Sequence, residues 1–329
     1  MRKTIHLCLS SHEEIMYRSE ADLIMGFNCL ALAILETESR LMGEGFMTTH
    51  HHYLVQTDDY EAVAHKNRYA YTRYFNAKYS RKGPLGESRC FALEVEGEYH
   101  TISALNYVLR QGLHHGLSAT PFGYPHCSAN AFFRKEMGKD FTPPLLSPSG
   151  RKKYLPHNKQ LPLNYRMDKN GMILREDIVD TSYVERLYVT PRSFCFYMNR
   201  VTDEKSIQKQ KEENDLPPVT LSAIESGVKE FDVEKSLRQE YGRVDTGRMT
   251  DLELCRIIDD ICVPRIARHD AGATIYTLSK TQREDIGNAL LRAVQDVRCG
   301  AVYSRSSLAD FFEDRKVSDA QIRRCLALE

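Results

Sequence analysis

The sequence contains no paired cysteine motif, and this absence excludes two classes of small, cross-linked domain. Its nine cysteines are scattered from Cys8 to Cys325, and none forms a CxxC pair. An odd and dispersed set argues against both a disulfide framework and a zinc ribbon. We therefore expect most of the cysteines to be small hydrophobic side chains in the core.

A long apolar run and an excess of charge are also missing. The longest apolar stretch is interrupted by Asn28, and the N-terminal residues lack the basic-then-apolar plan of a signal peptide. We therefore expect a cytoplasmic protein with no membrane partner. The 45 basic and 45 acidic residues cancel, so overall charge does not bear on nucleic-acid binding. Locally, residues 66–89 contain seven basic residues and one acid.

The first part of the chain predicts an α+β domain over residues 1–139. Its hydrophobic pattern alternates between strand and helix periods, in the order strand, helix, strand, helix, strand, helix. Because 329 residues with 42% hydrophobic content exceed one typical domain, further structured regions are expected beyond it. The predicted strands cover 4–10, 41–56 and 90–95, and the predicted helices cover 20–38, 58–79 and 102–113.

A region of different character follows. Prolines surround a predicted hairpin at 165–179 that turns at Lys169-Asn170-Gly171. This composition indicates a basic, partly extended connector over 140–231.

Residues 232–329 are predicted to form a helical C-terminal region. Ser279 with Gln282, and Ser318 with Gln321, have the capping-box spacing. The last helix could present Arg323 and Arg324 to DNA as part of a helix-turn-helix, but packing or dimerisation is the simpler role for it.

Three consecutive histidines occupy a predicted strand. Successive side chains of a strand point to opposite faces, so His50 and His52 share one face while His51 lies on the face that packs on the helices. Two neutral imidazoles two residues apart can grip one divalent ion from the same side. The alternative is a trio of surface histidines, which the pair by itself does not exclude.

A tyrosine and a glutamine lie one turn apart on the predicted helix at 102–113. Tyr107 and Gln111 are four residues apart and therefore share a face. A phenol can attack a DNA phosphodiester when the charge on its oxygen and on the phosphate is offset, and a metal ion can do this. The amide oxygen of Gln111 could complete a site that two histidines leave open. Taken singly, Tyr107 would be a packing residue and Gln111 a solvated one.

The predicted helix at 58–79 and the residues just after it combine cations with aromatic rings. Rings offer stacking platforms to unpaired bases, and Arg and Lys pair with phosphates, which is the combination expected for single-stranded DNA. Some of the rings must face the core, and Phe75 is expected there. The expected DNA contacts are Arg68, Arg73, Lys78, Arg81 and Lys82.

The order of these elements resembles that of the single-tyrosine HUH transposases. A strand with His-x-His is followed by a helix running into the basic-aromatic segment 71–83, then by a strand and a helix with Tyr-x-x-x-Gln. The chain is similar to the transposases of small single-strand insertion sequences and to the REP-associated tyrosine transposases. Residues 124–128 look like the Tyr-Pro-x-Ser-Ser stretch of that family. The resemblance covers residues 1–135.

The resemblance implies an HUH-type antiparallel sheet with helices, and a metal-dependent endonuclease and strand transferase for single-stranded or hairpin DNA. His50, His52 and Gln111 would bind Mg²⁺ or Mn²⁺. Tyr107 would attack a phosphodiester to give a 5′-phosphotyrosine, and the freed 3′-hydroxyl would serve strand transfer. Whether Tyr107 acts within its own protomer or across a homodimer is left open.

Two positions depart from the family pattern. The middle HUH position is usually bulky and apolar but here is His51, and the Asn that commonly precedes the pair is replaced by Thr49. The first departure places a neutral histidine in the core. The second removes no ligand.

Three other functions are consistent with parts of the sequence. A replication initiator or relaxase uses the same chemistry, but a relaxase places its tyrosine before the histidines. Initiators tend to carry a lysine near the tyrosine, whereas here the partner of Tyr107 is Gln111. A domesticated DNA-binding protein would keep the fold without cleaving, although Tyr107 and the metal ligands are all retained. A hydrolytic zinc enzyme is disfavoured because no HExxH or comparable spacing is present.

Overall fold

The computed structural model describes residues 2–11, 14–87, 89–199, 204–214, 217–220, 247–268, 270–299 and 306–328. Its central element is a four-stranded antiparallel sheet in the order β2-β3-β1-β4. The helices and this sheet confirm the predicted α+β class. The strands are β1 (Lys3–Ser10), β2 (Arg40–Phe46), β3 (His50–Thr57) and β4 (Phe91–Val95).

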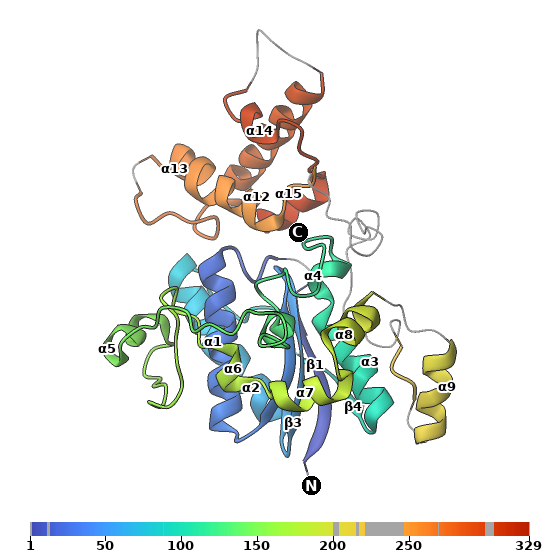
Figure 1. Cartoon of the computed structure of the whole chain (residues 1–329). Helices are drawn as coiled ribbons and strands as arrows, with labels where there is room; N and C mark the ends of the chain where they lie inside the picture. The colour runs from blue at the N-terminus through green and yellow to red at the C-terminus, as the bar shows by residue number, and fades with distance from the viewer. Residues whose placement is uncertain are drawn as a thin grey trace.

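Helices cover both faces of the sheet (Figure 1). The first face carries α1 (Glu20–Glu36) and α2 (Tyr60–Tyr79), and the second carries α3 (Glu98–Leu109). Helix α1 begins where Ser19 and Asp22 cap each other's backbone amides in a reciprocal box. On the second face, Gly43 of β2 lets α3 approach closely, because a Cβ there would lie 3.1 Å from the Leu105 side chain.

The prediction of one strand over 41–56 was wrong, because the chain reverses direction within it. Strands β2 and β3 form a hairpin whose turn is closed by the Met47 amide donating to the His50 carbonyl at 2.8 Å. The Thr48 carbonyl accepts hydrogen bonds from the Met16 and Tyr17 amides, which hold the turn from outside. No Gly, Pro or Asn marks the turn in the sequence, so a local pattern could not reveal it.

The predicted helix at 102–113 is also interrupted. Helix α3 ends at Leu109, and a short helix, α4 (Gln111–His114), follows after Arg110, whose backbone angles of φ −93° and ψ 8° leave the helical range. Tyr107 and Gln111 therefore lie on two successive helices and not on one. They remain adjacent, because the Gln111 side-chain amide donates to the Tyr107 carbonyl at 3.0 Å.

The outer edge of β2 is covered by residues 124–128. The Phe46 amide donates to the His126 carbonyl, and the Ser128 hydroxyl bonds both backbone groups of Glu44. The Tyr124 hydroxyl donates to the Phe46 carbonyl at 2.7 Å. This pairing protects an edge strand that would otherwise be open and fixes it against α3 and α4.

The described residues within 140–220, expected as a connector, contribute buried side chains to the same core as the sheet. The predicted turn is present, since the Gly171 amide donates to the Asp168 carbonyl and Met167 pairs with Ile173. The expected boundary at 231 lies outside the described residues. The helices here are α5 (Pro148–Arg151), η2 (Lys152–Tyr154), α6 (Arg175–Ile178), α7 (Thr181–Tyr188), α8 (Pro191–Met198) and α9 (Glu204–Glu213), after η1 (Ser128–Ala131).

The C-terminal helices build a second hydrophobic core, and Figure 1 shows them grouped at one end of the sheet. The capping box of Ser279 and Gln282 is confirmed as reciprocal. Ser318 caps its helix, but the Gln321 side chain bonds the Met249 carbonyl instead of closing a box. The elements are α12 (Asp251–Ile257), η3 (Ile258–Cys262, a π-helix), α13 (Val263–Ile266), α14 (Lys280–Arg298), η4 (Ala309–Phe312) and α15 (Asp319–Cys325).

The role weighed for Arg324 as a DNA-reading residue is excluded by its burial. Its side chain is 1% exposed and pairs with the Asp251 carboxylate at 3.1 Å. Helix α15 therefore packs against α12 in the way that the simpler interpretation predicted.

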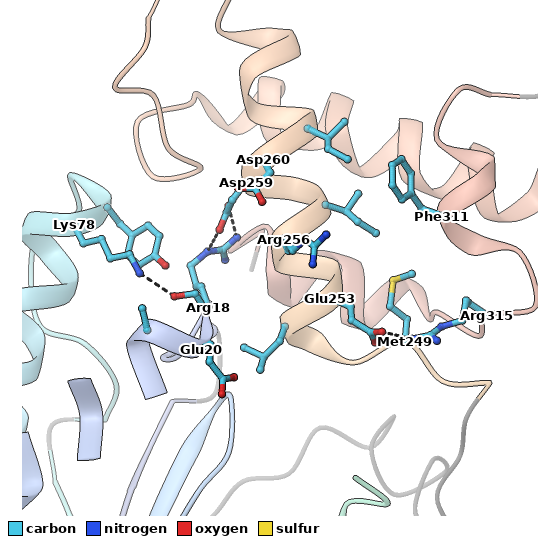
Figure 2. Close-up of a pocket in the computed structure, with 16 residues that line it drawn as sticks. Arg18, Glu20, Lys78, Met249, Glu253, Arg256, Asp259, Asp260, Phe311 and Arg315 are labelled. Atoms are coloured by element: carbon cyan, nitrogen blue, oxygen red, sulfur yellow. Dashed lines mark hydrogen bonds and ion pairs between the residues drawn. The ribbon is translucent and has the colours of Figure 1, made fainter. Parts of the chain in front are cut away.

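Two residues before α1 join the sheet domain to the C-terminal helices. Ile15 is fully buried in the second core. The Arg18 guanidinium, whose side chain has no exposed surface, donates to both carboxylate oxygens of Asp259 at 2.9 and 2.7 Å and to the Cys325 carbonyl. Figure 2 shows Arg18 bonded to Asp259, and both residues line a cavity of about 960 Å³ between the two parts. This paired, hydrogen-bonded cation ties the parts together, because removing one partner would leave a buried charge.

Among the described residues, no helix combines the length and the apolar character needed to span a bilayer.

Candidate functional site

The structure brings all four predicted catalytic and metal-binding residues together on the second face of the sheet. His50 and His52 project from β3, with their ring centroids 5.0 Å apart. The Tyr107 ring stands edge-on to the His52 ring, with centroids 4.9 Å apart. Gln111 is adjacent to Tyr107 through the hydrogen bond described above. The cluster is therefore continuous from β3 to α3 and α4.

His51 lies on the opposite face, as strand alternation predicts. Its ring stacks on Phe46 with centroids 4.5 Å apart. The Asn67 amide lies 3.0 Å from Nε2 and the Tyr17 hydroxyl lies 2.7 Å from Nδ1, so both ring nitrogens have partners. Burial lowers the pKa of His51 to about 3. It is a neutral, hydrogen-bonded core residue.

His52 is held by two residues of the neighbouring strand that the sequence analysis did not identify. The rings of His6 and His52 stack, and His6 Nε2 lies 3.2 Å from His52 Nδ1. The Cys8 sulfur lies 3.9 Å from His52 Nε2. Burial, and then the proximity of His50, lower the pKa of His52 well below its usual value. The imidazole is therefore neutral, which is the form that binds metal ions.

These residues fit a divalent metal ion. Gln111 Oε1 is buried and has no hydrogen-bond partner among the described residues. A buried carbonyl oxygen without a partner is costly, and a cation would satisfy it. Within the described chain, no group of three His, Cys, Asp or Glu side chains could hold a metal ion, so a third protein ligand here would be of another kind, such as an amide oxygen. His50, His52 and Gln111 supply two neutral nitrogens and one oxygen.

Gly45 of β2 allows Gln111 to reach this position. Gly45 pairs with His52 in the sheet, and a Cβ at Gly45 would lie 2.6 Å from the Val108 carbonyl oxygen and 3.2 Å from Gln111 Cγ. Such a contact would force the junction of α3 and α4 away from β3.

We therefore expect Gly45→Ala to displace Gln111 and Tyr107 from the histidines. Overpacking of this kind costs about 1–3 kcal/mol, so the protein should stay folded with a lower melting temperature. The affinity for Mn²⁺, measured by titration calorimetry, should fall by more than the loss of folding stability alone would cause. The matched control is Gly138→Ala, at an open position where a Cβ meets no atom within 4 Å, although its positive φ adds strain. Unchanged Mn²⁺ affinity in Gly45→Ala would contradict the role given to this contact.

Two more histidines border the cluster, and a signal in the sequence could have revealed them. His115 lies with its ring centroid 5.6 Å from that of His50, and His114 lies 6.4 Å from Tyr107. Residues 107, 111, 114 and 115 follow the spacing of a single helix face. His6 and Cys8 gave no such signal, because their contact with His52 depends on the pairing of β1 with β3.

The cluster is closed in this conformation. Exposed fractions are 5% for His50, 0% for His52 and Gln111, and 4% for Tyr107. A DNA phosphodiester must therefore displace covering side chains before it can reach the Tyr107 hydroxyl.

The five predicted DNA-contact residues are dispersed, and four have partners within the chain. Lys78 donates to the buried Asp22 carboxylate at 2.6 Å, and Arg81 pairs with Glu14. Arg68 donates to the Glu87 carbonyl. Arg73 is exposed and lies over the Tyr69 ring at 5.7 Å, while Lys82 is exposed beyond the end of α2. Phe75 is fully buried, as predicted.

Arg73 and Lys78 line a basic groove between the outer side of α2 and residues 153–159. The groove has a volume of about 930 Å³, and none of its described lining residues is acidic. Its cations are Lys66, Arg73, Lys78, Lys153 and Lys159, and its aromatic residues are Tyr69, Tyr74, His65 and His157. Glu36, at its edge, pairs with Lys66 and Lys159. The groove lies over the first face of the sheet, so the sheet separates it from Tyr107.

Comparisons with known proteins show a distant structural likeness. No family model and no curated protein matches the chain. The chain is similar to a solved structure of a REP-associated tyrosine transposase bound to a REP hairpin. The matched region covers 43% of this chain and 82% of that chain, with 10% sequence identity and a TM-score of 0.35. A TM-score this low carries no residue roles across, so the roles proposed below rest on this chain's own contacts.

Proposed function

We propose that this protein is a transposase-like, metal-dependent endonuclease and strand transferase for single-stranded DNA. The observation that carries the proposal is the convergence of His50, His52, Gln111 and Tyr107 on one face of the sheet, with the Gln111 oxygen buried and without a partner among the described residues. Two imidazoles and an amide oxygen can hold a divalent metal ion, and a phenol can serve as the nucleophile in metal-assisted attack on a phosphodiester.

Each residue has a separate task in this chemistry. His50, His52 and Gln111 would hold Mg²⁺ or Mn²⁺, which when bound offsets the charge of the phosphate. The phenol oxygen of Tyr107 attacks phosphorus and loses its proton to solvent, while the bond from phosphorus to the 3′-oxygen breaks. The phosphate stays on Tyr107 with the 5′ end of the downstream strand, and the released 3′-oxygen takes up a proton to become a hydroxyl. In strand transfer, that hydroxyl attacks the phosphorus of a second phosphotyrosine. The bond from phosphorus to the tyrosine oxygen then breaks, and the tyrosine oxygen takes up a proton.

The experiment that tests the proposal asks which DNA fragment stays with the protein. Single-stranded oligonucleotides of random sequence, labelled at one end, are incubated with the full chain and Mn²⁺ and separated on a denaturing gel. A 3′-terminal label should migrate with the protein, because the downstream fragment carries the 5′-phosphotyrosine. A 5′-terminal label should be released. If neither label yields DNA-linked protein, the proposal is refuted.

The basic groove would hold unpaired DNA away from the cleavage site. Exposed Tyr69 and half-buried Tyr74 offer ring faces, and the cations that no carboxylate pairs with offer partners for phosphates. Arg73 and Lys153 are the best placed, since both are exposed, each lies over a tyrosine ring, and neither has a carboxylate partner among the described residues.

We expect Arg73→Gln with Lys153→Gln to weaken binding of single-stranded DNA. Each phosphate that the protein no longer neutralises should reduce the slope of log affinity against log salt by about 0.7. The matched control is Arg292→Gln, which removes an exposed cation from α14. Fluorescence anisotropy at several salt concentrations measures the slopes. Equal slopes for the double variant and the control, or equal affinity for a blunt duplex, would contradict the groove as a single-strand site.

One observation favours a second function, that of a DNA-binding protein which no longer cleaves. Tyr107 is 4% exposed and its ring is packed against His52 and His6. In that case the groove would bind DNA and no covalent product would form under any metal condition. The labelled-DNA experiment separates the two functions.

A further inference from the structure

A small cavity lies directly beside the candidate site, at the junction with the C-terminal helices. Its volume is about 230 Å³. The sheet domain provides one wall, with Thr48, His115, Leu117 and Tyr124, and the C-terminal region provides the other, with Arg248 and residues 250–252. The cavity therefore exists only when the two parts of the chain are joined.

Its walls continue the elements that carry the catalytic residues. Thr48 stands two residues before His50 in the hairpin turn, and His115 directly follows α4, with its ring 5.6 Å from that of His50. A DNA strand whose phosphate lies at Tyr107 would bring a neighbouring nucleotide to this position. The larger junction cavity in Figure 2 shares Glu20 and Leu252 with it but has neither histidine in its lining.

The lining suits a flat, mostly apolar group with a negative neighbour. Leu117, Tyr124 and Leu252 supply apolar surface. The two carboxylates at the cavity have partners, since Glu20 pairs with His126 at 3.0 Å and Asp251 pairs with Arg324. Arg248 makes a long hydrogen bond of 3.4 Å to the His115 carbonyl, and its Nε is buried without a partner among the described residues. A nucleobase with its phosphate meets both requirements.

The junction holds this wall firmly against the site. The Thr48 hydroxyl donates to the Asp251 carboxylate at 2.7 Å, and Gln321 and Arg324 donate to the same carboxylate. Arg18 adds the bidentate contact with Asp259. The C-terminal helices thus fix both the turn that precedes His50 and the position of Arg248.

We propose that the C-terminal region completes a subsite for one unpaired nucleobase next to the phosphate that Tyr107 attacks, with Arg248 holding the adjoining phosphate. This inference rests on the proposed function, and it assigns the C-terminal region a part in choosing the DNA sequence that is cut. A volume of about 230 Å³ accepts a single base and excludes a base pair, so duplex DNA cannot occupy it.

The test compares DNA binding with and without bases while cleavage is blocked. Affinities of the full chain for a thymidine 12-mer and for an abasic 12-mer of equal charge are measured in chelator. Leu117→Trp fills the cavity and should weaken binding of the thymidine 12-mer about tenfold, since stacking of one base is worth that much. Binding of the abasic 12-mer should not change. The matched control is Leu163→Trp, at a side chain that is 78% exposed, and it should have no effect.

A second measurement decides the case if Leu117→Trp does not fold. A 12-mer of 4-thiothymidine is cross-linked by light, and the peptides are identified by mass spectrometry. Cross-links should map to residues 115–126 or 248–252, and Arg248→Gln should reduce them. Cross-links confined to α2 and residues 153–159 would overturn the subsite. So would an equal loss of affinity for the thymidine and abasic 12-mers in Leu117→Trp. If the subsite signals persist while no DNA-linked Tyr107 is ever found, the cleavage proposal fails and the base subsite stands.

Discussion

Tyr107→Phe is expected to abolish the covalent protein–DNA product while leaving DNA binding nearly intact. The substitution removes only the phenol oxygen, and the ring can still pack against His52 and His6. The rate of adduct formation should fall by at least about a thousandfold. Loss of the covalent nucleophile removes the whole reaction pathway, whereas loss of one binding contact would only weaken it. Denaturing gels of the 3′-labelled DNA measure the product, and anisotropy measures binding.

The matched control is Tyr71→Phe, since Tyr71 is another buried tyrosine and lies on the opposite face of the sheet. Its hydroxyl donates to the Met16 carbonyl, so its loss should lower stability and leave the adduct in place. Mass spectrometry of the trapped peptide identifies the attached residue. DNA linked to a tyrosine other than Tyr107, or adduct formation by Tyr107→Phe, would remove Tyr107 from the mechanism.

His50→Ala and His52→Ala should each lower cleavage by more than about a hundredfold, since even residues that only orient a metal ligand are worth about 10- to 100-fold. Both variants should also bind Mn²⁺ more weakly in titration calorimetry, which is a readout independent of cleavage. Chelator should reproduce the loss of cleavage in the unchanged protein. Gln111→Ala should have a smaller effect, because water can replace one ligand.

His51→Ala is the control that distinguishes strand alternation from a simple histidine cluster. His51 faces the other side of the sheet, where it stacks on Phe46 and has a partner at each ring nitrogen. Its removal should cost about 2–4 kcal/mol of unfolding free energy, through a cavity and two unsatisfied groups, and leave Mn²⁺ affinity unchanged. If His51→Ala weakened Mn²⁺ binding as much as His52→Ala, the assignment of faces would be wrong.

The closed state of the site should affect the rate of the proposed cleavage as well as the access of DNA. Because Tyr107 is almost fully covered, a measured rate would include the opening of the covering side chains. Variants at the junction, such as Asp251→Asn, would change that opening through the hydrogen bond with Thr48 without touching the proposed ligands. A change in rate at constant Mn²⁺ affinity would therefore report on access to the site.

Local patterns in the sequence were sufficient for the α+β class, for the helix that Ser279 caps, and for the opposite facing of His51 and its two neighbours. Each of these depends on residues two to four positions apart, whose geometry the backbone fixes within one strand or one turn. The adjacency of Tyr107 and Gln111 was predictable for the same reason, and it survives the break at Arg110.

What the tertiary structure alone decided involves residues far apart in the chain. His6 reaches His52, 46 residues away, only through the register of β1 on β3. Arg18 meets Asp259 across 241 residues, and residues 153–159 form a wall of the basic groove. In the sequence, charged residues such as Lys78 and Arg324 looked available for DNA. In the fold, both form ion pairs with buried carboxylates. A sequence records which side chains carry charge, whereas packing decides which of those charges still face solvent, because a buried carboxylate requires a partner wherever the chain can supply one.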